Sequence, residues 1–175
     1  MSTPSEELAY FLKQNLERIF GSEKVPLIIS VQSPREVEIS ANVSDLEAFA
    51  MKMAKGEASK HGVTIEEVRL NLREAGPRAL ELTANVRAKK MFFVTTVRIT
   101  GRMEVDGQLA ATVSNLNCTG EGAIGSMACG FLAPQLAKVD GQTVPLTAFL
   151  NSDISLRDVR LSTGEKIIVS VELNA

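Results

Sequence analysis

One segment of this sequence has no charged side chain over about four helical turns. It lies between Glu121 and Lys138, and it is too short to span a bilayer as a helix. Drawn as a helix, it has an arc of small residues and an arc of bulky ones. The small arc contains Gly122, Ser126, Cys129, Gly130, Ala133 and Ala137, and the bulky arc contains Ile124, Met127, Phe131, Leu132, Leu136 and Val139. Because a helix that is apolar all round is normally buried all round, we expect other elements to enclose it.

The length and charge of the chain limit the classes of protein to which it can belong. Its 175 residues predict a single domain, 1–175, and a net charge of −2 argues against binding to nucleic acid. The chain contains no apolar run long enough for a membrane span. Acidic residues at Glu6 and Glu7 stand where a secretory signal would be basic. We therefore expect a cytoplasmic location, or the cell envelope if a leader segment precedes this sequence.

Two further helices have recognisable start and stop signals. Thr3, Pro4 and Glu6 form a capping box with Pro at the first helical position, and they predict an amphipathic amino-terminal helix within residues 1–21. We expect this helix to pack on the main body, residues 22–175. A second capping box at Ser44–Glu47 predicts another helix, which ends at Gly62.

The rest of the sequence has the period-two pattern of strands. Residues 25–31 and 35–43 are predicted strands, and the same pattern resumes at Val63 for more than fifty residues. A slip of phase at Glu66 and Glu67 indicates a β-bulge, and Asp106-Gly107 indicates a hairpin. Strands this long twist strongly, so we expect an α+β fold in which a long, highly curved antiparallel sheet wraps around the helices.

Two parts of the sequence match weakly. Residues 154–161 and 63–70 both contain two alternating apolar residues, a charged pair and then Val-Arg-Leu. Each lies downstream of a predicted helix and precedes a turn and another strand. This pattern predicts two helix-plus-strand units that pack face to face.

The sequence contains no recognisable catalytic, metal or cofactor site. His61, the single histidine, lies at a predicted helix end, where a positive charge suits the helix dipole. Cys118 and Cys129 lack the spacing of a zinc site, and buried thiols are the favoured interpretation, with a disulfide as the alternative. We therefore predict that this protein is not an enzyme and needs no cofactor.

Methionine and phenylalanine recur in the segments predicted to meet inside. Flexible Met side chains adapt to irregular gaps and to ligands of variable shape. Ordinary core packing needs the same residues, and the sequence does not separate the two roles. The predicted apolar lining of a ligand groove is Phe49, Met53, Phe93, Val97, Met127, Phe131 and Phe149. Phe92 breaks the alternation of its strand, which indicates a groove mouth or a contact surface.

A set of basic residues lies on the predicted outer face of the long hairpin. These are Arg87, Lys89, Lys90, Arg98 and Arg102. They are candidates to contact anionic lipid headgroups or an acidic partner. The alternative is an ordinary solvated sheet face, because Glu81 and Glu104 lie nearby and dilute the positive field.

The predicted organisation resembles the tubular lipid-binding (TULIP-like) superfamily, including the bacterial LmeA-type phospholipid-binding proteins. The residues that carry the resemblance are Gly130-Phe131-Leu132-Ala133-Pro134, Val144-Pro145-Leu146 and Leu156–Leu161 followed by Gly164. The resemblance covers about residues 25–175. It implies an apolar cavity for a lipid or a similar chain molecule, often near a membrane.

The sequence therefore predicts non-enzymatic binding of a lipid or another elongated hydrophobic ligand, in a groove between the curved sheet and the uncharged helix. Such a protein would act as a carrier or sensor and would contact a membrane peripherally. The alternative is an interaction module with a solid core that forms homo-oligomers through the amino-terminal helix and Phe92.

Overall fold

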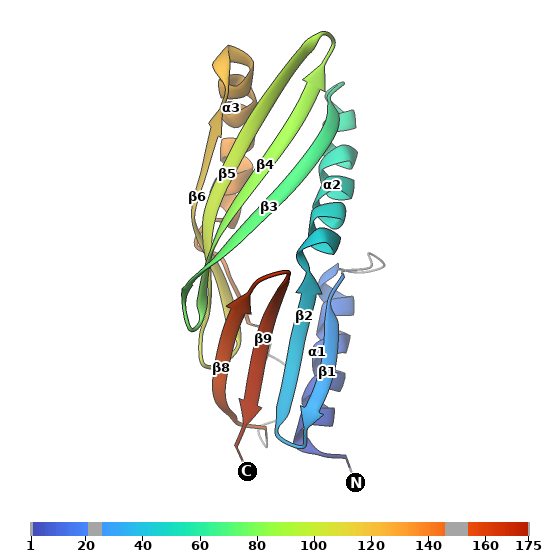
Figure 1. Ribbon diagram of the computed structural model, residues 1–175, viewed down its shortest axis with the longest axis vertical. Helices are drawn as coiled ribbons and strands as arrows, with labels where there is room; N and C mark the ends of the chain where they lie inside the picture. The colour runs from blue at the N-terminus through green and yellow to red at the C-terminus, as the bar shows by residue number, and fades with distance from the viewer. Residues whose placement is uncertain (1, 21–25, 146–153, 175) are drawn as a thin grey trace.

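The computed structural model describes residues 2–20, 26–145 and 154–174. Within these residues it contains three helices and two antiparallel sheets, which follow one another along the long axis of the molecule (Figure 1). The helices are α1 (Pro4–Phe20), α2 (Val43–Ser59) and α3 (Gly122–Val139). The strands are β1 (Ile28–Ser33), β2 (Glu36–Asn42), β3 (Thr64–Gly76), β4 (Ala79–Lys90), β5 (Phe93–Val105), β6 (Ala110–Gly120), β7 (Thr143–Pro145), β8 (Leu156–Thr163) and β9 (Lys166–Leu173). The predicted α+β class is confirmed.

Helix α1 begins at the predicted capping box. The Thr3 backbone N–H donates to the Glu6 carboxylate at 2.9 Å, and the Glu6 N–H donates to the Thr3 hydroxyl at 3.3 Å. These reciprocal bonds satisfy N–H groups that the first helical turn leaves without partners. The apolar face of α1, which includes Leu8 and Leu12, is buried against the four-stranded sheet, as expected from the sequence.

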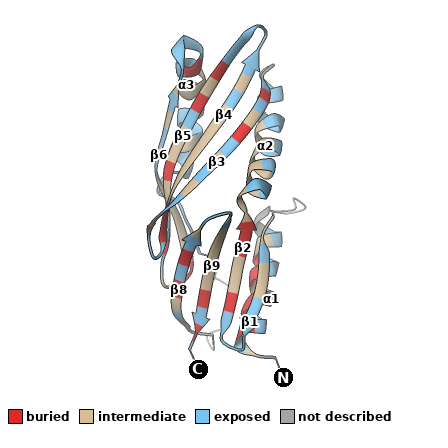
Figure 2. Ribbon diagram, in the orientation of Figure 1, coloured by how far each residue is buried: buried red, intermediate tan, exposed pale blue. Residues whose placement is uncertain are grey.

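The four-stranded sheet has the order β1-β2-β9-β8, and together with α1 it supplies most of the buried core cluster. Its alternating residues meet α1 on one side, where Val37, Val159 and Val171 are fully buried. The same cluster includes Leu80, Val105 and Leu109, which come from the near ends of β4, β5 and the turn before β6. Figure 2 shows buried residues in both sheets, whereas α2 is almost entirely intermediate or exposed. The prediction of a single domain remains a prediction.

The five-stranded sheet has the order β3-β4-β5-β6-β7, and its long strands match the predicted alternation. The register between β3 and β4 shifts between Ile65 and Glu67, which confirms the predicted bulge. The turn at Asp106-Gly107 also forms. There the Asp106 carboxylate accepts the N–H groups of Gln108 and Ala110 at 2.8 and 3.0 Å.

The predicted wrapping of the sheet around α3 is wrong. Neither sheet is strongly curled. Strands β8 and β9 do not enclose α3, because β9 pairs with β2 along its whole length, from Asn42↔Lys166 to Glu36↔Glu172. This pairing buries the alternating apolar residues of both strands in a separate sheet. The five-stranded sheet is left open, with α2 along β3 and α3 along β6.

Helix α2 differs from the prediction at its start. Asn42 is the N-cap residue and makes no side-chain capping bond, so Ser44–Glu47 is not a capping box. The Glu47 carboxylate instead accepts the backbone N–H of Leu70 at 2.9 Å, which ties α2 to β3. The helix ends at Ser59, before the predicted Gly62. Gly62 has the expected left-handed conformation, with a φ of +70°, and the N–H of Val63 donates to the carbonyl of Ala58.

The two matching sequences have the same local structure. Strand β8 shifts its register between Leu156 and Asp158, the positions equivalent to the bulge of β3. The arginine that follows each bulge pairs with the acid two residues before it, Arg69 with Glu67 and Arg160 with Asp158. Hydrogen bonding to Arg160 lowers the pKa of Asp158.

The two units do not pack face to face as predicted. They meet where β8 passes the β3–β4 turn, and there the Leu161 N–H donates to the Pro77 carbonyl at 2.7 Å. The Thr163 N–H donates to the Glu74 carboxylate at 2.8 Å. The units are joined end to end because each sheet presents its hairpin turn or edge strand to the other.

Candidate hydrophobic-ligand surface

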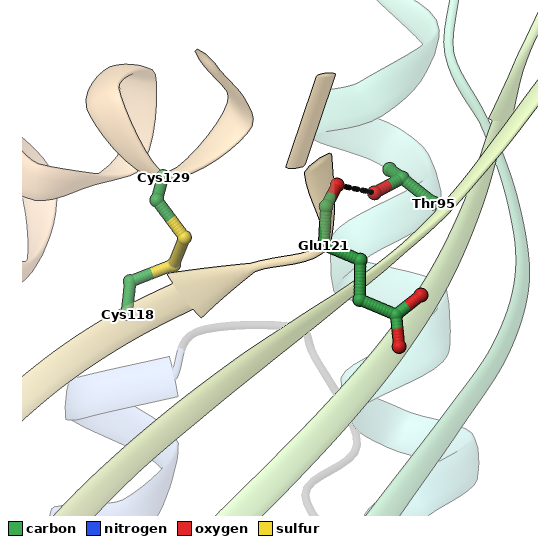
Figure 3. The surroundings of a disulfide bond; sticks show 4 residues. All are labelled: Thr95, Cys118, Glu121 and Cys129. Carbon is green, nitrogen blue, oxygen red and sulfur yellow. Dashed lines mark hydrogen bonds between the residues drawn. A yellow bond between two sulfur atoms is a disulfide. The ribbon is translucent and has the colours of Figure 1, made fainter. Parts of the chain in front are cut away.

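A disulfide attaches the uncharged helix to the five-stranded sheet. Cys118 of β6 and Cys129 of α3 form this bond, with their Cα atoms 5.5 Å apart (Figure 3). Burial as free thiols, the interpretation favoured from the sequence, is therefore wrong. The pairing arises because α3 follows β6 directly and turns back along it, which brings Cys129 beside Cys118.

Backbone contacts hold the start of α3 just as closely. A Cβ atom added to Gly120 would lie 2.1 Å from the Gly125 carbonyl group, so strand and helix touch where neither has a side chain. The Thr95 hydroxyl donates to the Glu121 carbonyl at 3.1 Å (Figure 3). At the other end of the helix, the Gly141 N–H donates to the Val113 carbonyl at 2.7 Å. Helix α3 is thus fixed at both ends.

The face of α3 that lies on the sheet does not coincide with the arc of small residues. Among the described residues of the helix, Gly125 alone is buried, and the half-buried ones recur at helical spacing beside it. They are Ala128, Cys129, Leu132 and Leu136. The small residues Ser126, Gly130 and Ala133 are exposed. The helical projection grouped the small residues on one side of the helix. It did not show which side the disulfide turns toward the sheet.

The opposite side of α3 is apolar and exposed. Ile124, Met127 and Phe131, which we call the outer face of α3, project from successive turns. The exposed fraction is 62% for Met127 and 74% for Phe131. The expectation that the helix is buried all round is therefore wrong. Covalent and backbone contacts hold this helix in place without covering the residues of its outer face.

A second exposed apolar group lies at the β4–β5 turn. Four consecutive residues, Met91 to Val94, form this group, which we call the β4–β5 tip. The prediction that Phe93 faces inward is wrong, because Met91, with a φ of +57°, and Phe92 form the turn, and the strand begins only at Phe93. The expected exposure of Phe92 is confirmed, at 92%.

The seven residues predicted to line a groove do not come together in one cavity. Val97 is only 4% exposed and belongs to the packed face of the sheet, whereas Met127 and Phe131 point away from it. On α2, Phe49 is half-buried and Met53 is exposed, and Phe93 belongs to the tip. Phe149 lies outside the described residues. A ligand-binding role for these residues remains a prediction.

The hollows of the described surface lie elsewhere. An open hollow of about 430 Å³ lies beside the β3–β4 turn, with Pro77, Arg78 and Glu104 in its wall. A smaller one of about 190 Å³ lies between α3 and β6, beside the disulfide. Sites for small molecules usually enclose at least about 300 Å³, so the second is too small for a lipid chain. A ligand of α3 would have to lie on its outer face.

Four of the five predicted basic residues lie on the outer face of the sheet, whereas Lys90 has the strand parity of the inner face, like Ala88 and Val86. Most of the five have polar partners. Arg87 pairs with Glu66 at 3.1 Å, Arg98 donates to the Asn85 side chain at 3.2 Å, and Arg102 pairs with Glu104 at 2.7 Å. Lys89 and Lys90, next to the tip, have no ion-pair partner among the described residues. Arg98 bonds to a neutral side chain, so the positive charge of this set that no acid pairs with lies at Arg98 and, next to the tip, at Lys89 and Lys90.

The total exposed surface is large for a chain of this length. It amounts to 10762 Å², whereas a compact monomer of the same mass exposes about 8,300 Å². The elongated shape and the uncovered sides of α2 and α3 contribute to this larger exposed area. Such exposure of contiguous apolar residues is typical of interaction surfaces.

Within the described part of the chain, no group of acidic, histidine or cysteine side chains could hold a metal ion. The same residues include no helix that is long and apolar enough to cross a membrane. His61 is exposed just after α2. Comparison with protein-family models, curated proteins and solved structures finds no match.

Proposed function

We propose that this protein binds a lipid or another elongated hydrophobic ligand without catalysing a reaction on it. The observation that supports this proposal is the outer face of α3: three bulky apolar residues are exposed on a helix that a disulfide and a glycine–glycine contact hold rigidly. Binding to a rigid surface avoids the entropy cost of ordering that surface first.

The ligand in this proposal lies along a surface and is not enclosed in a tube. An acyl chain would cover Ile124, Met127 and Phe131, with the polarizable Met adapting to its shape. The resemblance to tubular lipid-binding proteins supports only the class of ligand in this proposal, an extended apolar chain.

A binding titration tests the proposal. Protein stripped of co-purified lipid would be mixed with a fatty acid that carries a polarity-sensitive fluorophore. We expect saturable binding that weakens at least tenfold in the double variant Met127→Ser, Phe131→Ser, because most of the apolar contact area is lost. The variant Tyr10→Ser removes an exposed aromatic side chain from α1 and should bind like the wild type.

Native mass spectrometry of the purified protein gives an independent test. We expect bound acyl-chain species that solvent extraction releases. Failure of the wild type to bind the fluorescent fatty acid, together with the absence of co-purified lipid from repeated preparations, would exclude the proposed function.

Self-association is the second candidate, and the large exposed apolar surface favours it. The outer face of α3 and the tip would then be covered by another copy of the chain. The amino-terminal helix is a poor candidate for this contact, because its apolar face is already buried. Light scattering distinguishes the two functions: an oligomer that dissociates on substitution Phe92→Asp supports self-association, and a monomer excludes it.

A further inference from the structure

The β4–β5 tip lies at one end of the long axis of the molecule (Figure 1). Helix α1 begins and strand β9 ends near the opposite end. The exposed fractions of the four tip residues are 75% for Met91, 92% for Phe92, 59% for Phe93 and 48% for Val94. Among the described helices and strands, none lies beyond this turn in the view of Figure 1, so the tip can contact another surface.

The strands below the tip keep it in a fixed position. Strands β4 and β5 pair without a register shift from Lys90↔Phe93 down to Ala79↔Glu104. At the level of Thr96, the N–H of Glu121 donates to the Thr96 carbonyl at 3.1 Å, which ties β5 to the start of α3. The apolar residues of the tip therefore project from a rigid support.

Positive charge borders the apolar tip. Lys89 stands opposite Val94 in the pairing of β4 with β5, and Lys90 stands opposite Phe93. Of the nearby acids, Glu66 pairs with Arg87, and Glu121 lies further from the tip than the two lysines, at the level of Thr96. Lysine stems can lie along apolar groups while their ammonium groups stay at the level of lipid phosphates.

We propose that the β4–β5 tip is a membrane-docking site, which inserts Met91 to Val94 into the surface of a bilayer that contains anionic lipid. Lys89 and Lys90 contact the phosphate groups of the lipid headgroups. Apolar and aromatic side chains bordered by basic ones are the composition that binds at membrane interfaces. This docking involves residues other than the outer face of α3 and does not depend on ligand binding there.

The area and charge of the tip favour a bilayer over a second copy of the chain. At about 200 Å² for a fully exposed aromatic side chain, the four tip residues expose roughly 500 Å² together. A stable protein interface needs about 800 Å² from each partner. A symmetric tip-to-tip dimer would also bring the lysines of two copies together, where like charges repel.

A single-tryptophan reporter tests the proposal, since the chain contains no Trp. The variant Phe92→Trp would be mixed with vesicles of phosphatidylcholine, with or without phosphatidylglycerol. We expect a blue shift of Trp emission and quenching by brominated lipid on the anionic vesicles. The control Tyr10→Trp, on α1, should show neither change.

Sedimentation with the same vesicles measures how much each group contributes. Phe92→Ser should lower the partition coefficient at least tenfold, and the double variant Lys89→Gln, Lys90→Gln should lower it about fivefold per lysine on anionic vesicles only. High salt should reduce binding of the wild type but not of the lysine variant. Circular dichroism would establish that each variant is folded.

Three results would overturn the proposal. The first is an absence of wild-type sedimentation with anionic vesicles. The second is an unshifted emission of Phe92→Trp when the protein does sediment. The third is light scattering that shows an oligomer which Phe92→Ser dissociates, because the tip would then be a protein interface. Vesicle binding that stays intact in the α3 variants, which lose fatty-acid binding, would show that docking depends on the tip and not on the outer face of α3.

Discussion

The two sheets of this protein bury their helices to very different extents. Helix α1 places Leu8, Ala9 and Leu12 in the core beside the four-stranded sheet. Helix α2, which the structure describes in full, has no buried residue, and α3 has only Gly125. The four-stranded unit is therefore stabilised by hydrophobic burial. The five-stranded unit also buries strand residues such as Ile65, Val68 and Val97. Its helix α3, however, is held mainly by one disulfide and backbone contacts, which leave Ile124, Met127 and Phe131 exposed.

The largest effect expected from this comparison is in the core around α1. Leu8 is fully buried, so Leu8→Ala should lower the free energy of unfolding by about 2 to 5 kcal/mol. Tyr10→Ala, in the same helix but exposed, should change it by about 0.5 kcal/mol or less. Urea unfolding followed by circular dichroism measures both. Equal effects of the two substitutions would contradict the assignment of the core.

Removal of the disulfide should have the second-largest effect on stability. The 11-residue separation of Cys118 and Cys129 corresponds to about 3 kcal/mol in the loop-entropy model. The double variant Cys118→Ser, Cys129→Ser should therefore lose about this much stability. Amide hydrogen exchange should accelerate in α3 while α1 and β9 change little. Uniform acceleration over the whole chain would show that the two units are not distinct in stability.

A pair of glycines tests how α3 lies on the sheet. A Cβ atom on Gly125 would come within 2.6 Å of the Gly120 backbone, so Gly125→Ala should cost about 1 to 3 kcal/mol. Gly130 has nothing within 4 Å of the same position. Gly130→Ala should therefore stabilise the helix by up to about 1 kcal/mol. Thermal unfolding would reveal the opposite signs, and the reverse order would mean that another face of α3 contacts the sheet.

The caps of the first two helices should show the smallest difference. Thr3→Ala removes the capping hydroxyl of α1 and should cost about 1 kcal/mol. Ser44→Ala lies at the cap expected from the sequence for α2 but makes no capping bond there, so it should cost less than about 0.5 kcal/mol. Chemical denaturation of the two variants checks this pair. A larger loss of stability from Ser44→Ala than from Thr3→Ala would support the N-cap that the sequence predicts for α2.

Local sequence patterns predicted most of the elements. The uncharged segment predicted α3 with its observed bounds, and the slip at Glu66 and Glu67 predicted a bulge that forms. These features depend on neighbouring residues, so periodicity and capping determine them. The matching segment at residues 154–161 forms a second bulge of the same kind, so the same local pattern gives the same local structure.

The arrangement of the elements and the candidate surface were less predictable. Pairing of β9 with β2 joins residues that lie far apart in the chain, and no local pattern indicates it. The exposure of Phe131 depends on which side of α3 the disulfide turns toward the sheet. Apolar composition alone predicts burial, because it does not distinguish a core residue from a surface that awaits a partner.

Hydrogen exchange with and without a bound fatty acid tests the central claim most directly. The claim is that the five-stranded unit presents its apolar surface to a ligand while the four-stranded unit supplies the stable core. We predict that the ligand slows exchange in α3 and leaves α1, β2 and β9 unchanged. Protection confined to the four-stranded unit, or no protection at all at saturating fatty acid, would contradict it.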